Sequence, residues 1–383
     1  MRVAIVGDYP LNGTLIWGGV EAAFAYLVKE LARLDDLDLH VITLGNPALN
    51  GGNGHKRDGA TLHVLPPFPR FEFARNFSTY QERLNRALAE IKPDLVHAQG
   101  ATDHAYGALR SGYPTVITVH GVQSEDSKHQ GTFRTRARKW LYGLLIERYN
   151  LSHTRHLIAI GRYVAEYFRK QMRPDAQVYY VPNAIDDSYF NLSEQGNGST
   201  ILYAGRVIRR KRALDLVHAF AKIASQMPSA HLRLAGEFDS EPDYGERVQH
   251  AIVEANLSDR VHMLGGLSEQ MILREFEACD VLALPSIQET TPMVIAQAMA
   301  AGKPVVATPV GGVPEMVRDR ENGFLVPVAD TDRLADALLC VLSDPILRVR
   351  MGQAGRQFAL ENYLAANVAR RTRDVYSRIA VRN

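Results

Sequence analysis

A repeating alternation of two sequence patterns constrains the fold of this chain more than any other feature. Short runs rich in β-branched residues, such as 3–7, 39–44 and 115–119, are followed by a polar or glycine-containing turn. Apolar residues at helical spacing come next, as in 77–91. Strands that alternate with helices in this way predict βαβ units. We therefore expect a parallel sheet whose two faces are covered by helices.

The alternation is interrupted once near the middle of the chain. Residues 191–200 (NLSEQGNGST) are polar and lack periodicity, which is typical of a linker. The same alternation then returns over residues 201–307. The sequence therefore predicts an α/β protein with two Rossmann-like, doubly wound domains, residues 1–190 and 191–363. A helix is expected in residues 364–383, and packing back on the first domain is one arrangement open to it.

The composition fits this organisation and excludes several classes of protein. At about 150 residues per domain, 383 residues allow two sizeable domains. With 46% apolar and 22% charged residues, the chain is neither disordered nor a disulfide scaffold. Its net charge of +2 supplies no field for nucleic-acid binding, so no nucleic-acid partner is expected. Two cysteines, Cys279 and Cys340, form no disulfide framework and indicate a reducing compartment.

Two further features bear on location. The first apolar run ends at Asp8 and Pro10, too early for a signal peptide, and no apolar run reaches the roughly 18 residues of a membrane span. A cytoplasmic protein is therefore expected.

Residues 134–146 (RTRARKWLYGLLI) place four basic residues before a Trp, Tyr and Leu run. Such a segment can contact the inner face of a membrane that carries a lipid-linked acceptor. The alternative is that its apolar side packs inside the domain.

The most informative stretch of the second half is residues 284–309. Thr291 before Pro292 predicts a helix N-cap followed by proline at the first helical position, and Gly302 predicts the end of that helix. This helix would begin just beyond the carboxyl end of a strand. In doubly wound sheets that edge binds ligands, so two facing sheets would place a site in the cleft between them.

The start of this helix suggests an anion site. Unpaired N–H groups and the positive end of the helix dipole attract anions. After Pro292, Met293 and Val294 keep their N–H groups, and Thr291 and Glu289 precede them in the loop. An ordinary βαβ turn is the alternative interpretation of this stretch.

A basic turn opens the second half. Arg206 follows the strand at 201–204, and Lys211 comes five residues later. A guanidinium fork and a mobile ammonium are together suited to binding a diphosphate. Arg209, Arg210 and Arg212 crowd the same turn, so a solvated basic loop is the alternative.

In the first half, two features lie at predicted strand ends. Gly18 and Gly19 precede a helix and permit close approach of the backbone to a ligand. They lack the GxGxxG spacing, and no acidic residue follows the second strand, which disfavours a nicotinamide-binding fold. His120 ends the strand at 115–119 and is a candidate for the same site. A lone histidine is otherwise more often structural.

These residues belong to a set of motifs that occur in order along nearly the whole chain. The motifs are GGVE (18–21), TVHG (118–121), VPNAID (181–186), AGR (204–206) with Lys211, LPS (284–286), Glu289, AMAAGKPVVAT (298–308), GGVPEMV (311–317) and NGFLVP (322–327). As an ordered set, they resemble family four of the retaining glycosyltransferases. That resemblance implies the GT-B architecture, two Rossmann-like domains with one domain for each substrate, and a nucleotide-sugar donor.

The resemblance also implies roles for individual residues. Arg206 and Lys211 would bind and neutralise the diphosphate of the donor, which is the leaving group. Glu289 would bind hydroxyls of the donor sugar, and His120 would lie beside its reactive carbon. The two cations would supply the charge that a metal ion supplies elsewhere, so no metal and no other cofactor is expected.

Glycines and one glutamine complete the expected site. The backbone of Gly18 and Gly19 would approach the diphosphate or the acceptor, and Gly265 and Gly266 would hold the base. The family's second glutamate, which holds the ribose, is replaced here by Gln297. The amide can still donate and accept one hydrogen bond, although the charge-assisted contribution is lost.

The sequence therefore predicts a retaining, metal-independent glycosyltransferase. Its expected donor is a UDP-sugar, and its expected acceptor is a glycan, a lipid-linked molecule or a small molecule. Two alternatives stay open at this point. A nucleotide-sugar epimerase can share the two-domain architecture, and Gln297 leaves room for a non-catalytic, nucleotide-binding homologue.

Overall fold

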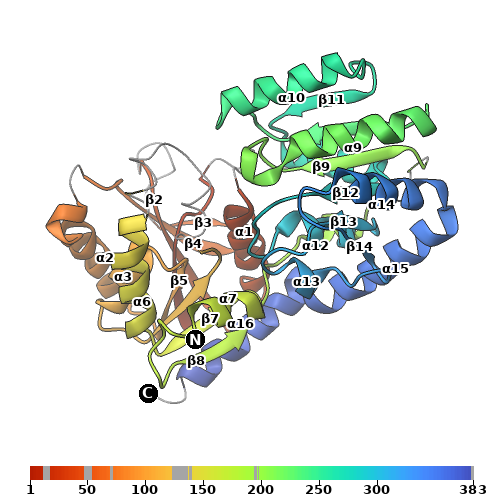
Figure 1. Cartoon of the computed structure of the whole chain (residues 1–383). Coiled ribbons are helices and arrows are strands. Elements are labelled where there is room, and N and C mark those ends of the chain that lie inside the picture. The colour runs from red at the N-terminus through yellow and green to blue at the C-terminus, as the bar shows by residue number, and fades with distance from the viewer. Residues whose placement is uncertain are drawn as a thin grey trace. The chain divides into compact units, whose positions relative to one another are not determined.

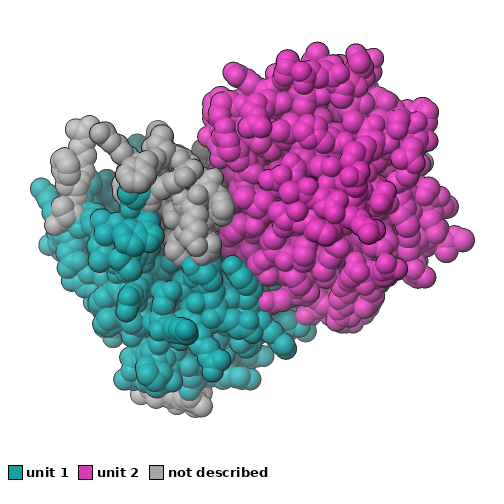
Figure 2. Space-filling view, in the orientation of Figure 1, with its two compact units in different colours: residues 1–128, 132–184, 365–383 teal, residues 129–131, 185–364 magenta. Residues whose placement is uncertain are grey.

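The computed structural model describes residues 1–11, 18–46, 54–69, 72–122, 137, 140–193, 196 and 198–380. These residues form two compact units (Figure 2). Unit 1 consists of the described residues up to 184 together with 365–380, and unit 2 of the described residues from 185 to 364. The predicted fold class is confirmed, because each unit is an α/β structure built on a mainly or wholly parallel sheet.

The sheet of unit 1 has the strand order β3-β4-β2-β1-β5-β6-β7-β8. Its strands are β1 (Arg2–Val6), β2 (Asp38–Leu44), β3 (His55–Arg57), β4 (Ala60–Leu65), β5 (Leu95–Gln99), β6 (Thr115–Val119), β7 (His156–Ala159) and β8 (Gln177–Tyr180). All neighbouring strands are parallel except β3, which pairs antiparallel with β4 at the edge. In the central strand β1, Val3 pairs with Leu39 and Leu95, and it is fully buried.

Helices cover both faces of this sheet. They are α1 (Gly19–Leu31), η1 (Phe73–Arg75), α2 (Ser78–Ile91), α3 (Asp103–Leu109), η2 (Gly143–Glu147), α6 (Arg148–His153), α7 (Arg162–Phe168) and α16 (Ala365–Ala380). Helices α2, α3 and α6 lie side by side (Figure 1), and their apolar side chains join one core with the sheet. Helix α16 packs on α1 and contacts β5, because Val368, Val375, Tyr376 and Ile379 form a buried stripe along it. The last helix of the chain therefore belongs to unit 1.

Unit 2 has an entirely parallel sheet of order β11-β10-β9-β12-β13-β14. Its strands are β9 (Thr200–Ala204), β10 (His231–Ala235), β11 (Val261–Gly265), β12 (Val281–Leu284), β13 (Val305–Ala307) and β14 (Gly323–Leu325). Its helices are α8 (Asp187–Phe190), η3 (Arg209–Lys211), α9 (Ala213–Gln226), α10 (Pro242–Glu254), α11 (Glu269–Ala278), α12 (Met293–Ala300), α13 (Val313–Met316), α14 (Thr331–Ser343) and α15 (Pro345–Asn362). Every helix within the described residues is too short or too polar to cross a bilayer.

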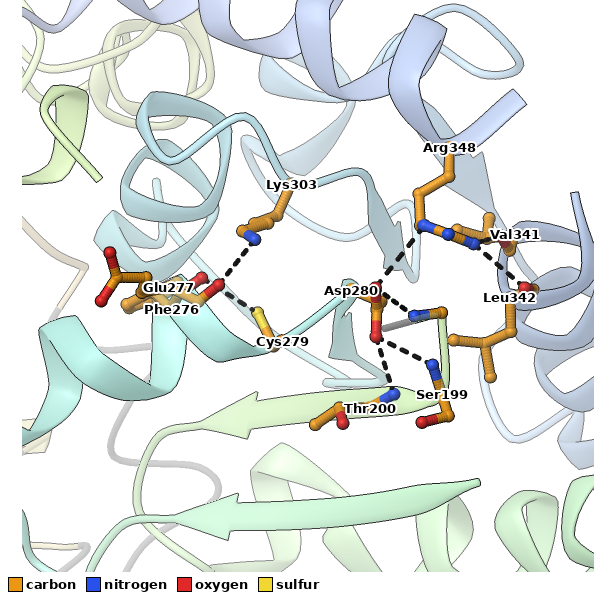
Figure 3. Close-up of polar contacts among 11 residues, drawn as sticks. Ser199, Thr200, Phe276, Glu277, Cys279, Asp280, Lys303, Val341, Leu342 and Arg348 are labelled. Atoms are coloured by element: carbon orange, nitrogen blue, oxygen red, sulfur yellow. Dashed lines mark hydrogen bonds and ion pairs between the residues drawn. The ribbon is translucent and has the colours of Figure 1, made fainter. Parts of the chain in front are cut away.

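A buried carboxylate fixes the start of the central strands of unit 2 (Figure 3). Asp280 lies between α11 and β12, and it accepts hydrogen bonds from the N–H groups of Gly198 (2.8 Å), Ser199 (2.9 Å) and Thr200 (2.9 Å). The Nε atom of Arg348 in α15 lies 3.6 Å from the same carboxylate. These contacts hold the beginning of β9 beside β12, so the carboxyl ends of both strands reach the same edge of the sheet.

Candidate active site

The carboxyl edge of the unit 2 sheet brings two of the predicted site residues into direct contact. Glu289 lies in the loop after β12, and Lys211 lies in the η3 turn after β9. The Nζ atom of Lys211 donates to Oε1 of Glu289 at 2.7 Å, and the hydroxyl of Ser286 donates to the same oxygen at 2.7 Å. The sequence predicted separate roles for these two side chains, whereas the structure pairs them.

The environment of Glu289 keeps its carboxylate charged. Burial alone raises the pKa of this group, but the positive charges of Lys211 and Arg210 and the hydrogen bonds from Lys211 and Ser286 outweigh that effect. The net result is a lowered pKa. An ionised carboxylate can accept hydrogen bonds from sugar hydroxyls, but it has no proton to donate as a general acid.

Arg210 is a site residue that the sequence analysis did not single out. It is buried, and its guanidinium donates to the carbonyl (2.7 Å) and to the side-chain oxygen (3.0 Å) of Gln288. Its own carbonyl accepts from the N–H of Ile287 at 2.9 Å. Arg210 thus ties the η3 turn to the Glu289 loop. Its neighbours Arg209 and Arg212 instead pair with carboxylates nearby, which the sequence pattern could not distinguish.

Arg206 presents an exposed guanidinium at the end of β9. Within the described part of the chain, no carboxylate lies within ion-pair distance of it, whereas its carbonyl accepts from the hydroxyl of Tyr203 at 2.7 Å. The backbone before it turns at Gly205, whose φ is +153°. Arg206 is therefore a cation positioned by main-chain contacts and available to an anionic ligand.

Three glycines line up where β9, β10 and β11 end. The N–H of Gly205 donates to the Ala235 carbonyl, and the N–H of Gly236 donates to the Gly265 carbonyl, each at 2.8 Å. A Cβ atom at Gly236 would lie 2.0 Å from the Gly205 carbonyl oxygen, so no larger residue fits there. A Cβ atom at Gly265 or Gly266 would meet no atom within 4 Å, so the main chain is open at this edge. Binding of the base by Gly265 and Gly266 stays a prediction, and the sequence analysis missed Gly236.

The predicted capping role of Thr291 is wrong. Helix α12 begins at Met293 with Pro292 as its N-cap, because Pro292 has an extended ψ of 116° that excludes it from the helix. No side chain caps this helix end, and the Thr291 hydroxyl is buried without a partner among the described residues. Met293 and Val294 form the first turn, as predicted, with N–H groups that have no acceptor inside the helix. Their contact with an anion stays a prediction.

Gln297 lies one turn further along α12 and is already engaged. Its Nε2 donates to the hydroxyl of Tyr189 in α8 at 2.9 Å, and Tyr189 is buried. This hydrogen bond joins α12 to α8. It uses the amide nitrogen of Gln297 and does not involve the amide oxygen. Contact of Gln297 with a ribose stays a prediction. It would use the amide oxygen or require the amide to leave Tyr189.

His120, in unit 1, is the end of a chain of polar contacts. It follows β6, with Nδ1 2.9 Å from the side-chain oxygen of Asn183 and Nε2 2.6 Å from that of Gln99. The Gln99 amide nitrogen lies 3.2 Å from Nε2 of His97, and Nδ1 of His97 lies 2.6 Å from the Tyr376 hydroxyl in α16. His120, Gln99 and Asn183 also line one small pocket. Asn183 belongs to the VPNAID motif, but no local signal pointed to Tyr376.

Burial keeps the two histidines of this series of contacts, His97 and His120, neutral near pH 7. It lowers the pKa of His120 to about 4, against an opposing contribution from the Asn183 hydrogen bond, and it lowers the pKa of His97 to about 3. A neutral imidazole donates from one nitrogen and accepts at the other. The His120 environment therefore supplies a hydrogen-bonding group rather than a positive charge.

The predicted glycines of unit 1 lie at the start of α1. Gly18 is the N-cap, has an extended backbone and is exposed, and a Cβ atom there would meet no atom within 4 Å. The backbone of Gly18 and Gly19 is thus accessible to a ligand, and its predicted contact stays a prediction. As for metals, no three His, Cys, Asp or Glu side chains gather into a metal-binding group in the portion of the chain that was searched.

Two family models match the chain and together span most of it. Residues 17–189 match the model for Glycosyltransferase Family 4, and residues 185–358 match the model for Glycosyl transferases group 1. Each half of the chain therefore matches a glycosyltransferase family model, and the first half matches that of family 4. The protein is accordingly a glycosyltransferase, an enzyme that transfers a sugar from a donor.

Relatives and solved structures agree with this assignment along the full length. The alpha-maltose-1-phosphate synthase of Mycolicibacterium smegmatis is 27% identical, over 99% of this chain and 100% of that protein. A sucrose-phosphate synthase structure from Thermosynechococcus elongatus superposes with a TM-score of 0.82 at 22% identity, covering 100% of both chains. Anabaena Alr3699/HepE, solved in complex with UDP and glucose, has a TM-score of 0.77 at 18% identity over 99% of this chain and 100% of that chain. The glycosyltransferase therefore has the GT-B fold.

Proposed function

We propose that this glycosyltransferase uses a nucleotide-diphospho-sugar, with UDP as the nucleotide, and retains the configuration of the transferred sugar. The observation that carries the proposal is the cluster at the carboxyl ends of β9 and β12. It combines an available cation, Arg206, with a Lys211–Glu289 pair in which the buried carboxylate is ionised. A diphosphate needs cations, and a donor sugar needs a hydrogen-bond acceptor for its hydroxyls. The UDP and glucose in the Anabaena neighbour are consistent with this donor class.

The cluster suggests how the donor bond is broken. As the sugar–oxygen bond breaks, negative charge grows on the diphosphate, and nearby cations stabilise that charge in the transition state. Arg206 is free to bind these oxygens at once. Lys211 can turn toward them because a donor hydroxyl can replace its hydrogen bond to Glu289. Two such cations supply the charge stabilisation that a metal ion provides in other enzymes, so we propose that none is required.

The same geometry favours retention. Glu289 is held by Lys211 and Ser286 and makes its contacts with both through one oxygen, which suits hydroxyl binding better than nucleophilic attack. The acceptor hydroxyl would then attack from the face that the diphosphate leaves, and a leaving phosphate oxygen would take its proton. The neutral His120, whose two ring nitrogens already contact Asn183 and Gln99, would lie beside the reactive carbon of the transferred sugar. We propose that the acceptor is a hydroxyl compound: a glycan, a lipid-linked molecule or a small molecule.

The test is a panel of nucleotide sugars scored for nucleotide release with and without candidate acceptors. We expect nucleotide release that depends on an acceptor and that continues in excess chelator. NMR should show that the product has the anomeric configuration of the donor. Arg206→Ala should weaken UDP binding by about 2–4 kcal/mol by calorimetry. The matched control is Arg209→Ala in the same turn, whose charge is already paired with Asp243 and Glu241. Equal UDP affinity in both variants would remove Arg206 from the site.

Other outcomes of the same panel point to other functions. An inverted product, or activity lost to chelator and restored by Mg²⁺, would refute retention or metal independence. An epimerised nucleotide sugar formed without an acceptor would indicate an epimerase. Nucleotide binding without turnover of any donor would favour the non-catalytic alternative, which the engagement of Gln297 with Tyr189 motivates.

A further inference from the structure

Unit 1 exposes a group of large apolar side chains on one side of a helical segment. Residues 140–142 are helical, and η2 (Gly143–Glu147) continues them as a π-helical turn. Trp140, Leu141, Leu144 and Leu145 are exposed to 41–54%. Their spacing places all four on one side of the helix, whereas Gly143 and Ile146 on the other side are buried. Single exposed apolar residues are common, but a contiguous group marks an interaction surface.

A fifth residue extends this surface to a second element. Phe73 in η1 is 44% exposed, and its ring centroid lies 6.3 Å from that of Tyr142. The hydroxyl of Tyr142 accepts from the N–H of Asp103 at 2.9 Å, which anchors the helical segment to the start of α3. We call the surface formed by Phe73, Trp140, Leu141, Leu144 and Leu145 the apolar face. It stands on the same side of the sheet as α2, α3 and α6.

Positive charge borders the apolar face, and two acidic side chains that lie close to these cations in sequence are buried. Arg75 in η1 and Arg148 in α6 are exposed, and neither forms an ion pair with a described residue. Glu72 and Glu147, their neighbours in sequence, are only 4% and 3% exposed. The rim of the apolar face is therefore complementary to a negatively charged partner.

We propose that the apolar face docks on the surface of a bilayer that contains anionic lipids. Tryptophan and leucine side chains can enter the boundary between headgroups and acyl chains, while arginines beside them bind lipid phosphates. A second copy of this chain fits less well. In a two-fold contact each copy would bring Arg75 and Arg148 toward the same cations of the other. The proposal is independent of the donor chemistry, because it concerns binding and not transfer.

The experiment is co-sedimentation of the full chain with vesicles of phosphatidylcholine alone or with phosphatidylglycerol added, at low and high salt. We expect binding to the anionic vesicles that weakens as salt rises. The double variant Trp140→Ser and Leu144→Ser should lower the affinity at least about tenfold. Arg75→Gln and Arg148→Gln should each lower it by about fivefold at low salt.

Matched controls come from α15 in unit 2. Ile346→Ser removes a side chain that is 80% exposed, and Arg350→Gln removes an exposed arginine, so both should leave vesicle binding within twofold of the parent. Circular dichroism melts should coincide for all variants, because every replaced side chain is exposed.

Three results would overturn the proposal. The first is a parent protein that does not bind anionic vesicles. The second is undiminished binding by the Trp140 and Leu144 double variant. The third is concentration-dependent dimerisation of the parent that this variant abolishes, which would assign the apolar face to a second copy. Sugar transfer to a soluble acceptor, measured without vesicles, reports separately on the proposed function.

Discussion

Replacement of Lys211 by methionine tests whether the contact with Glu289 organises the unit 2 site. Methionine keeps most of the length and apolar character of the side chain but removes the ammonium. Glu289 would then lose a 2.7 Å hydrogen bond and its closest positive charge while staying buried. The substitution should therefore lower the free energy of unfolding of unit 2 in addition to its effect on donor binding.

The size of the effect follows from the contacts that remain. Removal of one partner from a buried ion pair costs about 3–5 kcal/mol when the other charge is left uncompensated. Here Ser286 still donates to Glu289, and Arg210 Nη1 lies 3.8 Å from the second carboxylate oxygen. We expect about 2–3 kcal/mol for Lys211→Met. Adding Glu289→Gln removes the unpaired charge and should restore about 1–2 kcal/mol, a coupling of the size seen for contacting residues.

The assay must follow unit 2 separately. Residues 185–364 of unit 2 contain no tryptophan, and Trp140 belongs to unit 1, so tryptophan fluorescence during urea unfolding does not follow unit 2. Far-ultraviolet circular dichroism, with hydrogen exchange of peptides from residues 200–212 and 284–300, reports on unit 2. The control is Arg209→Met in the same turn, which is half-exposed and should cost less than about 1 kcal/mol. A Lys211→Met variant as stable as this control, or one that Glu289→Gln does not rescue, would refute the reasoning.

Four further outcomes are expected. Tyr376→Phe, which removes the hydroxyl beside His97, should change the pH profile of kcat more than KM if the polar chain positions His120, and an unchanged profile would make the contact merely structural. Gln297→Glu should keep or tighten UDP binding by about 1 kcal/mol and Gln297→Ala should loosen it in calorimetry, whereas no change in either would exclude a ribose contact. Asp280→Ala leaves three N–H groups, one buried and two partly buried, without their acceptor and should cost at least about 3 kcal/mol in urea unfolding; a loss below about 1 kcal/mol would contradict its role. The pKa values of His97 and His120 are about 3 and 4 in the folded protein and near 6.5 in the unfolded chain, so the unfolded chain binds more protons below pH 6.5. The free energy of unfolding should therefore fall by up to about 1.4 kcal/mol per pH unit for each histidine as the pH is lowered from 6.5 to 4. A free energy of unfolding that is flat from about pH 7 to 5 would argue against neutral histidines.

The sequence by itself determined the architecture and the location of the candidate site along the chain. Alternating strand and helix patterns predict two sheets of the doubly wound type, because side-chain periodicity is a local property of neighbouring residues. Gly302 after α12 marked the end of that helix for the same reason. The ordered motifs placed Arg206, Lys211 and Glu289 at strand ends, and parallel strands bring such ends to one edge of a sheet.

Tertiary structure alone decided which of these groups touch. Lys211 contacts Glu289 only because β9 and β12 are neighbouring strands, and local sequence patterns do not predict the order of strands in a sheet. The same contact between strand ends selects Arg210, among several adjacent cations, as the buried one that holds the Glu289 loop. The link from His120 to Tyr376 depends on the last helix packing against unit 1. Such contacts join residues far apart in the chain, so their distances and the protonation that follows from burial exist only in the folded protein.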